Sequence, residues 1–196
     1  ETCVISDALY SLGYFVMDSN NARYADQIEK IAYNALPGAV TKDFSALQYF
    51  SAPNQVLATP FSQLSAFLYG SASLRQYRPD HFAACCPGNI HRAMPNFISR
   101  MWMFAGNNIP VAVCYGPSEF SGIFNGVRYT VAENTMYPFE EKIEFKFTVA
   151  DDGTIPFVFR IPEWCKDTGV MLNGKELPLK HSGFVQINGI GNKDTL

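Results

Sequence analysis

The sequence contains no apolar run approaching the ~20 residues that are needed to span a bilayer. Charged residues are also few: they make up 17% of the 196 residues, and the net charge is -3 with the two signs scattered along the chain. There is no basic patch of the kind that contacts nucleic-acid phosphates. Hydrophobic residues, by contrast, make up 47% of the chain. We therefore expect a globular protein whose partner is neither a nucleic acid nor a membrane.

Cysteine is scarce, and its five positions do not form a disulfide framework or a C-x-x-C redox pair. Cys114 and Cys165 lie in apolar, strand-like segments, and we interpret both as buried structural thiols. Cysteine use leaves the compartment open between cytoplasm and periplasm. The chain begins at Glu1 inside a motif and without an initiator methionine, so we expect its natural N-terminus to lie further upstream.

The remaining cysteines suggest a metal site. Cys85 and Cys86 are adjacent and are followed by Pro87-Gly88, two residues that suit a bend in the backbone. Neighbouring cysteines fit disulfide geometry poorly, but both can turn toward one ion. A third thiol at Cys3 and a carboxylate at Glu1 would complete the four ligands that zinc prefers. Spacing alone leaves this hypothesis open.

Several motifs together resemble those of glycoside hydrolase family 127, whose best-known members are β-L-arabinofuranosidases. The motifs that carry this resemblance, in chain order, are Glu1-Thr2-Cys3, Ala22-Arg23-Tyr24-Ala25-Asp26 with Glu29, Tyr33 and Asn34, Cys85-Cys86-Pro87 with Asn89, Tyr137-Pro138, Arg160-Ile161-Pro162-Glu163-Trp164-Cys165, and Leu172-Asn173-Gly174. They run over nearly the whole chain. One departure is Gly88, where many relatives carry a second proline.

The resemblance implies a retaining glycoside hydrolase that releases L-arabinofuranose or a related sugar from glycans. It implies Zn²⁺ as the cofactor and a zinc-bound cysteine as the nucleophile in place of the usual carboxylate. Carried over by motif, the zinc ligands are Glu1, Cys3, Cys85 and Cys86, the nucleophile is Cys85, and the substrate-binding residues are Glu29 and Tyr49. The family's general acid/base glutamate falls upstream of residue 1, so we expect the chain alone to be inactive.

Hydrophobic periodicity predicts helices in the first half of the chain. The predicted helices cover 4–17, 22–36 and 89–104. The turn at Asp18-Ser19-Asn20-Asn21 supplies an N-cap for the second helix, and Pro37-Gly38 is expected to end it. Residues 47–58 are expected to form a strand-like loop and residues 59–83 an irregular loop.

Beyond residue 107 the hydrophobic period changes from 3.6 to 2, which indicates strands. The predicted strands cover 109–115, 127–132, 142–149, 155–161, 170–172 and 176–179. Asn173-Gly174 predicts a type I′ hairpin between the last two. Short strands at this rhythm predict an antiparallel β-sandwich over 108–196. The resemblance makes 1–107 the incomplete C-terminal portion of an (α/α)6 helical barrel, so the fold class is α+β and multidomain.

Alternatives remain at this stage. Without the resemblance, Glu29 is interpreted as an exposed helix glutamate paired with a lysine, and Tyr49 is equally a tyrosine packed under a loop. The same four ligands would also suit a structural zinc site in a non-catalytic carbohydrate-binding or scaffold protein. A thiol redox protein is a third class, although the C-x-x-C pair that it would use is missing. A homo-oligomer is left open, and the sugar and its linkage are not specified.

Overall fold

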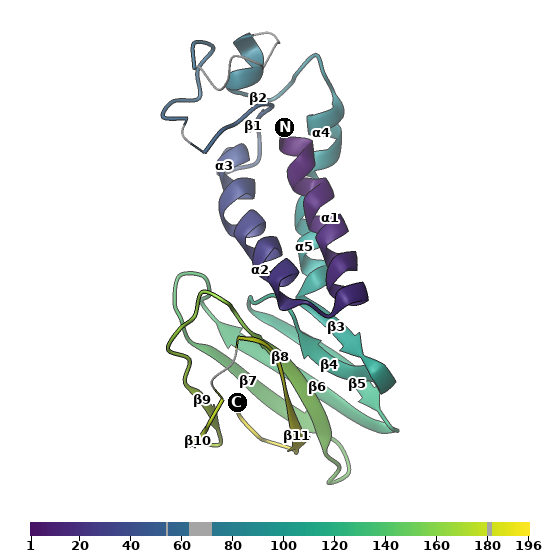
Figure 1. Ribbon diagram of the computed structural model, residues 1–196. Helices are drawn as coiled ribbons and strands as arrows, with labels where there is room; N and C mark the ends of the chain where they lie inside the picture. Colours follow the sequence, from purple (N-terminus) through teal and green to yellow (C-terminus); the bar gives the residue numbers. More distant parts are fainter. Residues whose placement is uncertain (54, 63–71, 180–181) are drawn as a thin grey trace. The chain divides into compact units, whose positions relative to one another are not determined.

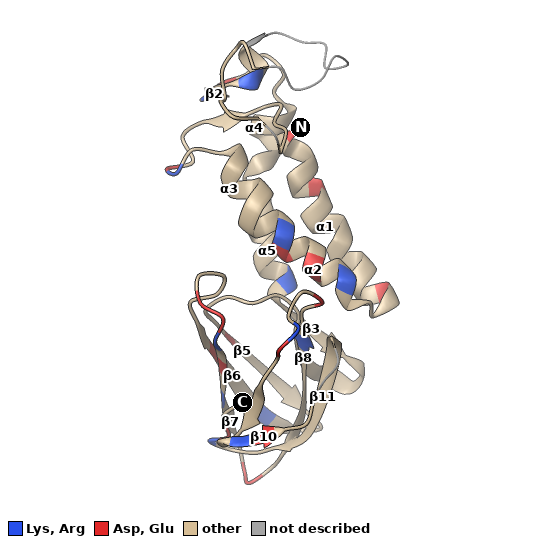
Figure 2. Cartoon of the chain, turned by 60° about the vertical axis from the view of Figure 1, so that its left-hand side comes forward, with Lys and Arg blue, Asp and Glu red and all other residues tan. Residues whose placement is uncertain are grey.

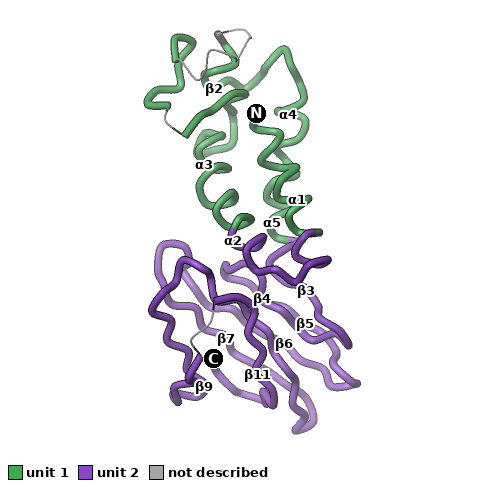
Figure 3. Tube along the Cα trace, in the orientation of Figure 1, with its two compact units in different colours: residues 1–14, 27–98 green, residues 15–26, 99–196 purple. Residues whose placement is uncertain are grey.

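The computed structural model describes the whole chain except residues 54, 63–71 and 180–181. It divides into two compact units (Figure 3). Unit 1 comprises Glu1–Tyr14 and Gln27–Ile98, and unit 2 comprises Phe15–Asp26 and Ser99–Leu196. Acidic and basic residues occur in both units (Figure 2). Among the described residues, no helix is both long enough and apolar enough to cross a membrane.

The first two predicted helices are present (Figure 1). Helix α1 covers Thr2–Ser19 and helix α2 covers Ala22–Lys30. The predicted N-cap is confirmed, because Oδ1 of Asn21 accepts a hydrogen bond from the N–H of Arg23 at 3.0 Å. This bond satisfies one of the N–H groups that have no partner within the helix.

The expected end of the second helix is wrong. The chain continues from α2 through a π-helical turn at Ile31–Ala35 into a short helix α3 at Leu36–Ala39. Pro37 therefore lies in the first turn of α3 and does not stop the helix. The π-helical turn leads directly into α3, with the N–H of Leu36 donating to the carbonyl of Ile31 just before Pro37.

The third predicted helix is divided and ends earlier. Helix α4 covers Cys85–Ile90, helix α5 covers Ala93–Met101, and strand β3 begins directly afterwards at Trp102. Pro95 falls in the first turn of α5, where it is tolerated, and the break in the helix lies instead at His91-Arg92. Backbone pairing with β4 continues as far as Trp102, which explains why Trp102–Ala105 is strand.

The two expected loops contain a small sheet. Strand β1 at Leu47–Gln48 pairs antiparallel with strand β2 at Tyr77–Arg78, and a 3₁₀ turn covers Ala72–Arg75. The irregular loop predicted for 59–83 includes residues 63–71, which lie outside the described residues. The expected strand-like character of 47–58 is thus limited to its first two residues, which carry the chain into Tyr49.

Unit 2 contains most of the strands. They are β3 Trp102–Ala105, β4 Ile109–Ala112, β5 Ser118–Phe124, β6 Val127–Thr135, β7 Ile143–Val149, β8 Ile155–Ile161, β9 Val170–Leu172, β10 Lys175–Leu177 and β11 Gly183–Ile190. The pattern located six of these segments and missed β3, β5 and β11. The hairpin signal is confirmed, because Asn173 and Gly174 both have positive φ, as a type I′ turn requires.

The strands form a four-stranded sheet of order β11-β8-β4-β3, a three-stranded sheet of order β5-β6-β7, and the hairpin β9-β10. The expected purely antiparallel arrangement is wrong at one pair, since β4 and β8 are parallel. Between β4 and β8 the chain forms all three strands of the other sheet. A parallel pair requires a long connection of this kind.

One hydrophobic core is shared by residues of both larger sheets. Phe147 of β7 contacts Phe157 of β8 with ring centroids 5.0 Å apart, and Phe145 contacts the same ring at 5.0 Å. Both pairs are edge-to-face, which is a favourable arrangement for aromatic rings. The strand predicted at 142–149 is confirmed as β7, and its buried residues Phe145, Phe147 and Val149 belong to this core.

Candidate active site and metal centre

Glu1 and Cys3 lie at the beginning of α1, whose first helical residue is Thr2. The first N–H groups of a helix have no partner within it, and the positive end of the helix dipole favours anions there. The N–H of Cys3 donates to Sγ of Cys86 at 3.3 Å, and Sγ of Cys3 donates to Oε2 of Glu1 at 3.4 Å. The helix start thus joins groups from both predicted motifs.

Thr2, between these two residues, is fully buried, and its side chain bonds to strand β1. Its hydroxyl donates to the carbonyl of Gln48, and its N–H donates to the carbonyl of Tyr49 at 3.0 Å. These two bonds join the beginning of α1 to Gln48, the last residue of β1, and to Tyr49, which follows it.

Cys85 and Cys86 are the first two residues of α4. We expected Pro87 and Gly88 to bend the backbone, but both continue the helix, because a proline in the first turn needs no acceptor. Successive helical residues point about 100° apart. As a result Cys86 is completely buried while Cys85 is exposed.

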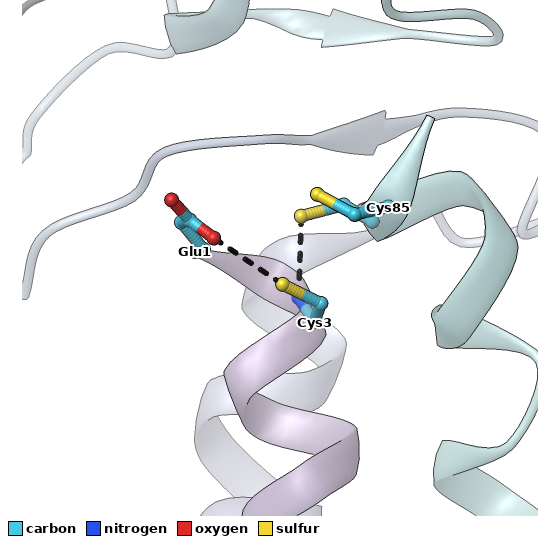
Figure 4. A group of neighbouring side chains, drawn as sticks. Glu1, Cys3 and Cys85 are labelled. Atoms are coloured by element: carbon cyan, nitrogen blue, oxygen red, sulfur yellow. Dashed lines mark hydrogen bonds between the residues drawn. The ribbon is translucent and has the colours of Figure 1, made fainter. Parts of the chain in front are cut away.

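Glu1, Cys3, Cys85 and Cys86 come together in unit 1, with one candidate ligand atom from each lying within 4.8 Å of the others. Figure 4 shows the side chains of Glu1, Cys3 and Cys85 converging. Two ligands of a tetrahedral zinc ion, each at about 2.3 Å, lie about 3.8 Å apart. Three thiols and a carboxylate form a donor set that zinc accepts, so the arrangement fits the metal after a small closure.

The three thiols differ in acidity. Burial raises the pKa of Cys3 to about 12, and hydrogen bonds with Cys86 and Glu1 add to this effect. Burial also raises the pKa of Cys86. The pKa of Cys85 is lowered instead, chiefly by its hydrogen bond with Tyr49. Cys85 is therefore the thiol that ionises most readily.

Tyr49 lies next to this thiol, with its hydroxyl 2.9 Å from Sγ of Cys85. Hydrogen bonding to Cys85, followed by burial, raises the pKa of Tyr49, so the phenol keeps its proton and can donate it in this bond. The tyrosine ring belongs to a buried cluster with Cys3, Cys86 and Leu47. The prediction that Tyr49 belongs to the site thus gains a contact, while its role toward a substrate stays a prediction.

His81 was not singled out from the sequence. It is 9% exposed, its ring centroid lies 5.9 Å from that of Tyr49, and its Nε2 lies 2.9 Å from the carbonyl of Leu47. Since a carbonyl only accepts, Nε2 carries the proton in this bond. His81 thus adds a second side-chain hydrogen bond to a β1 carbonyl, beside the one from Thr2. No periodicity or motif in the sequence marks it.

Glu29 lies in α2 and is only 3% exposed. The alternative that it is an exposed helix glutamate is therefore wrong. A buried carboxylate in a helix is costly unless it is hydrogen-bonded, so its burial is compatible with a functional role. Glu29 is not among the residues that form the Cys/Glu cluster. Its predicted role in substrate binding stays a prediction.

The other two cysteines differ from each other. Cys114 is fully buried, as predicted. Cys165 is only half-buried, so the prediction is wrong for this residue. Its sulfur accepts a hydrogen bond from the Thr168 hydroxyl at 3.2 Å. Cys165 follows the end of β8, where the chain turns away from the core.

Two family profiles match the sequence. Residues 1–99 match the catalytic domain of β-L-arabinofuranosidases of glycoside hydrolase family 127, and residues 111–195 match the middle domain of the same family. Together these matches span nearly the whole chain. The chain belongs to glycoside hydrolase family 127. No curated protein sequence matches it.

Solved structures share its fold. A family 127 β-L-arabinofuranosidase from Geobacillus stearothermophilus T6 superposes with a TM-score of 0.83 at 19% identity, over 100% of this chain and 30% of that one. A structure described as a glycoside hydrolase gives a TM-score of 0.81 at 18% identity, over 100% of this chain and 32% of that one. The family 127 β-arabinofuranosidase BT3674 gives 0.76 at 18% identity, over 100% and 31%. The chain thus spans about a third of the length of these relatives.

Proposed function

We propose that this chain carries the nucleophile of a retaining glycoside hydrolase that acts on β-L-arabinofuranosides or related glycans. The observation that carries the proposal is the cluster of Glu1, Cys3, Cys85 and Cys86, with Tyr49 in contact with the exposed thiol. Family membership supports the substrate class. The sugar and linkage follow only from the names of the relatives.

Glu1, Cys3, Cys85 and Cys86 would hold Zn²⁺, as the donor set described above permits. When bound, zinc would keep the thiols ionised at neutral pH, where a free thiol with a pKa near ~8.5 is mostly protonated. Cys3 and Cys86 lie in an apolar cluster that raises the pKa of both thiols. They are suited to remain ligands, since they are buried and held by the bond between the Cys3 N–H and the Cys86 sulfur.

Cys85 is proposed as the nucleophile because it is exposed, whereas Cys86 is not. Its thiolate attacks the anomeric carbon, the glycosidic C–O bond breaks, and the leaving oxygen takes a proton from a general acid. Water then attacks the same carbon, a base removes its proton, and the thiolate departs. Two displacements at one carbon give retention of configuration. Tyr49 stabilises the thiolate by donating its hydroxyl hydrogen before attack and after release.

The remaining parts of the enzyme are also proposals. We propose that 1–107, apart from strand β3, is the last portion of an (α/α)6 barrel and that 108–196 forms with β3 a β-sandwich, in which two sheets cover one core. The general acid would come from a glutamate upstream of Glu1, and Glu29 and Tyr49 would contact the sugar. General acid/base help is worth ~10²–10⁴ in rate, so residues 1–196 alone should not turn over substrate.

The test is covalent trapping. An arabinofuranose-derived electrophile is incubated with the protein, and the modified peptide is identified by mass spectrometry. The proposal expects the label on Cys85 and none on Cys86, and Cys85→Ser should abolish labelling. A label on Cys86, or on a carboxylate with both thiols free, would overturn the assignment. Zinc bound tightly with no labelling at all would instead support a structural zinc site in a carbohydrate-binding or scaffold protein.

A further inference from the structure

Unit 2 contains a cavity of about 400 Å³. None of the residues that line it belongs to the cysteine cluster. Its walls come from the segment between β6 and β7, which contributes Tyr137 and Glu141, and from the segment between β8 and β9, which contributes Trp164 and Thr168. Small-molecule sites have volumes of roughly 300–1,000 Å³, so the cavity is large enough for a ligand.

The walls and floor of the cavity are aromatic. Trp164 lines it and is 56% exposed, which is unusual for so large an apolar side chain. Tyr137 lines it too, and packs edge-to-face on the buried ring of Tyr115 with centroids 5.9 Å apart. The guanidinium carbon of Arg160 lies 5.2 Å from the centroid of the same Tyr115 ring, which holds this floor in place. An exposed indole within this aromatic lining offers a flat apolar surface to a ligand.

The cavity lining also carries charged groups, and their charges balance: Glu141 and Glu144 are opposed by Lys142 and Arg160, and Glu144 is also paired with Lys146 at 3.2 Å. Nζ of Lys142 lies 3.6 Å from a carboxylate oxygen of Glu144. Because these charges balance, the lining has no excess positive charge to attract an anionic ligand such as a nucleotide or a phosphate. A purely apolar ligand would cover these groups without replacing their hydrogen bonds to water, which costs free energy. The chemistry therefore favours a neutral ligand with one apolar face and several hydroxyl groups.

We propose that this cavity is a second carbohydrate-binding site, in which one sugar ring stacks on Trp164 and its hydroxyl groups contact Glu141 and Lys142. The site would hold a neutral glycan without cleaving it, since its residues include no part of the cysteine cluster. The choice of a sugar as the ligand rests on the proposed function, because the chain would then bind the same glycan in two places. The geometry of the cavity stands independently of that function.

Tryptophan fluorescence provides the test, because the chain contains only two tryptophans. Trp102 is half-buried, donates from Nε1 to the Ser118 hydroxyl at 3.0 Å and stacks on Phe120, so it is shielded from the cavity. Emission changes on ligand addition would therefore report on Trp164. The 196-residue chain with Cys85→Ser, which prevents any trapping, is titrated with arabino-oligosaccharides and xylo-oligosaccharides, and separately with anilinonaphthalene sulfonate as an apolar anionic probe.

The proposal expects saturable binding of an oligosaccharide that Trp164→Ala weakens at least about tenfold, as truncation of an aromatic anchor does. Trp164→Phe should restore part of the affinity, measured for both variants by calorimetry. Phe104→Ala removes an equally exposed aromatic side chain outside this cavity, at 53% exposure, and should bind normally. Binding of the anionic probe alone, no saccharide binding, or unchanged saccharide affinity in Trp164→Ala would each overturn the proposal. Failure of Cys85 labelling with saccharide binding intact would instead contradict only the proposed catalytic function.

Discussion

The Tyr49 hydroxyl lies 2.9 Å from Sγ of Cys85, across 36 residues of sequence. The carbonyl of the same Tyr49 accepts the N–H of Thr2 at 3.0 Å. One residue of one short segment therefore contacts the exposed thiol with its side chain and the helix start with its backbone. The hydrogen bond from Tyr49 lowers the pKa of Cys85, whereas burial raises the pKa values of Cys3 and Cys86.

The first prediction concerns that hydrogen bond. Tyr49→Phe removes the donor that stabilises the Cys85 thiolate, so the pKa of Cys85 should rise and its alkylation by iodoacetamide should move to higher pH. The measurement is the rate of Cys85 modification against pH in the chelator-treated protein, followed by peptide mass spectrometry. Cys165 in the same samples is the internal control, and its profile should not move. Coincident Cys85 profiles for the two proteins would show that Tyr49 does not stabilise the thiolate.

The second prediction concerns metal binding. The wild-type chain should bind one zinc ion, and Cys3→Ser or Cys86→Ser should weaken binding by more than the roughly 10–100-fold caused by losing a residue that only orients a ligand. Competition with a chromophoric chelator measures the affinity. Cys165→Ser is the matched control, since Cys165 lies outside the cluster. Equal zinc affinity in Cys3→Ser and Cys165→Ser would remove Cys3 from the ligand set.

The third prediction separates the hydroxyl of Thr2 from its size. Thr2→Val keeps the shape of the side chain but removes the hydroxyl that donates a hydrogen bond to the carbonyl of Gln48. The free energy of unfolding should fall by about 1–3 kcal/mol. Zinc affinity should fall with it, because Glu1 and Cys3 flank Thr2. Thr2→Ser keeps the hydroxyl and should restore most of both quantities. Urea denaturation measures the unfolding free energy of the two variants, and zinc titration measures their zinc affinity. Equal unfolding free energies and zinc affinities for Thr2→Val and Thr2→Ser would refute the role of the hydroxyl.

The fourth prediction concerns the ion pair between Arg160 and Asp26 in unit 2. The Arg160 side chain is completely buried, Asp26 is 15% exposed, and Nε of Arg160 also donates to the carbonyl of Val113 at 2.6 Å. Asp26→Ala leaves the guanidinium without its counter-charge and should cost about 3–5 kcal/mol in urea denaturation. Combining Asp26→Ala with Arg160→Met should recover much of this loss. A double variant as unstable as the sum of the two single variants would contradict the coupling.

The fifth prediction concerns pH. Burial raises the pKa of Tyr129 from 10 to about 12. The folded protein therefore holds this proton more tightly than the unfolded chain, so the stabilisation is complete below pH 10 and is lost as the pH rises toward 12. Tyr129→Phe cannot ionise, and its unfolding free energy should decline less between these two pH values. Chemical denaturation at a series of pH values measures both proteins, and parallel curves would contradict the assignment to Tyr129.

Local patterns were sufficient wherever the structure depends on neighbours in sequence. Asn173-Gly174 specified its hairpin because both residues tolerate positive φ, and Asn21 specified a helix start because its side chain reaches an N–H two residues away. Strand β7 was visible because its inward residues are all apolar. Strands β5 and β11 were missed: β5 contains Ser118, Glu119 and Ser121, and β11 contains Gly183 and Gly189, so neither shows a clear apolar alternation.

The motifs placed Glu1, Cys3, Cys85 and Cys86 in one family pattern, and the sequence by itself determined this candidate set. Only the tertiary structure decided that the four side chains meet, that Cys85 is exposed, and that Cys86 is buried. It also brought in His81, which no pattern marks. The physical reason is that exposure and acidity depend on what surrounds a thiol in space, and the burial and the Tyr49 hydrogen bond that distinguish these cysteines arise from segments far away in sequence.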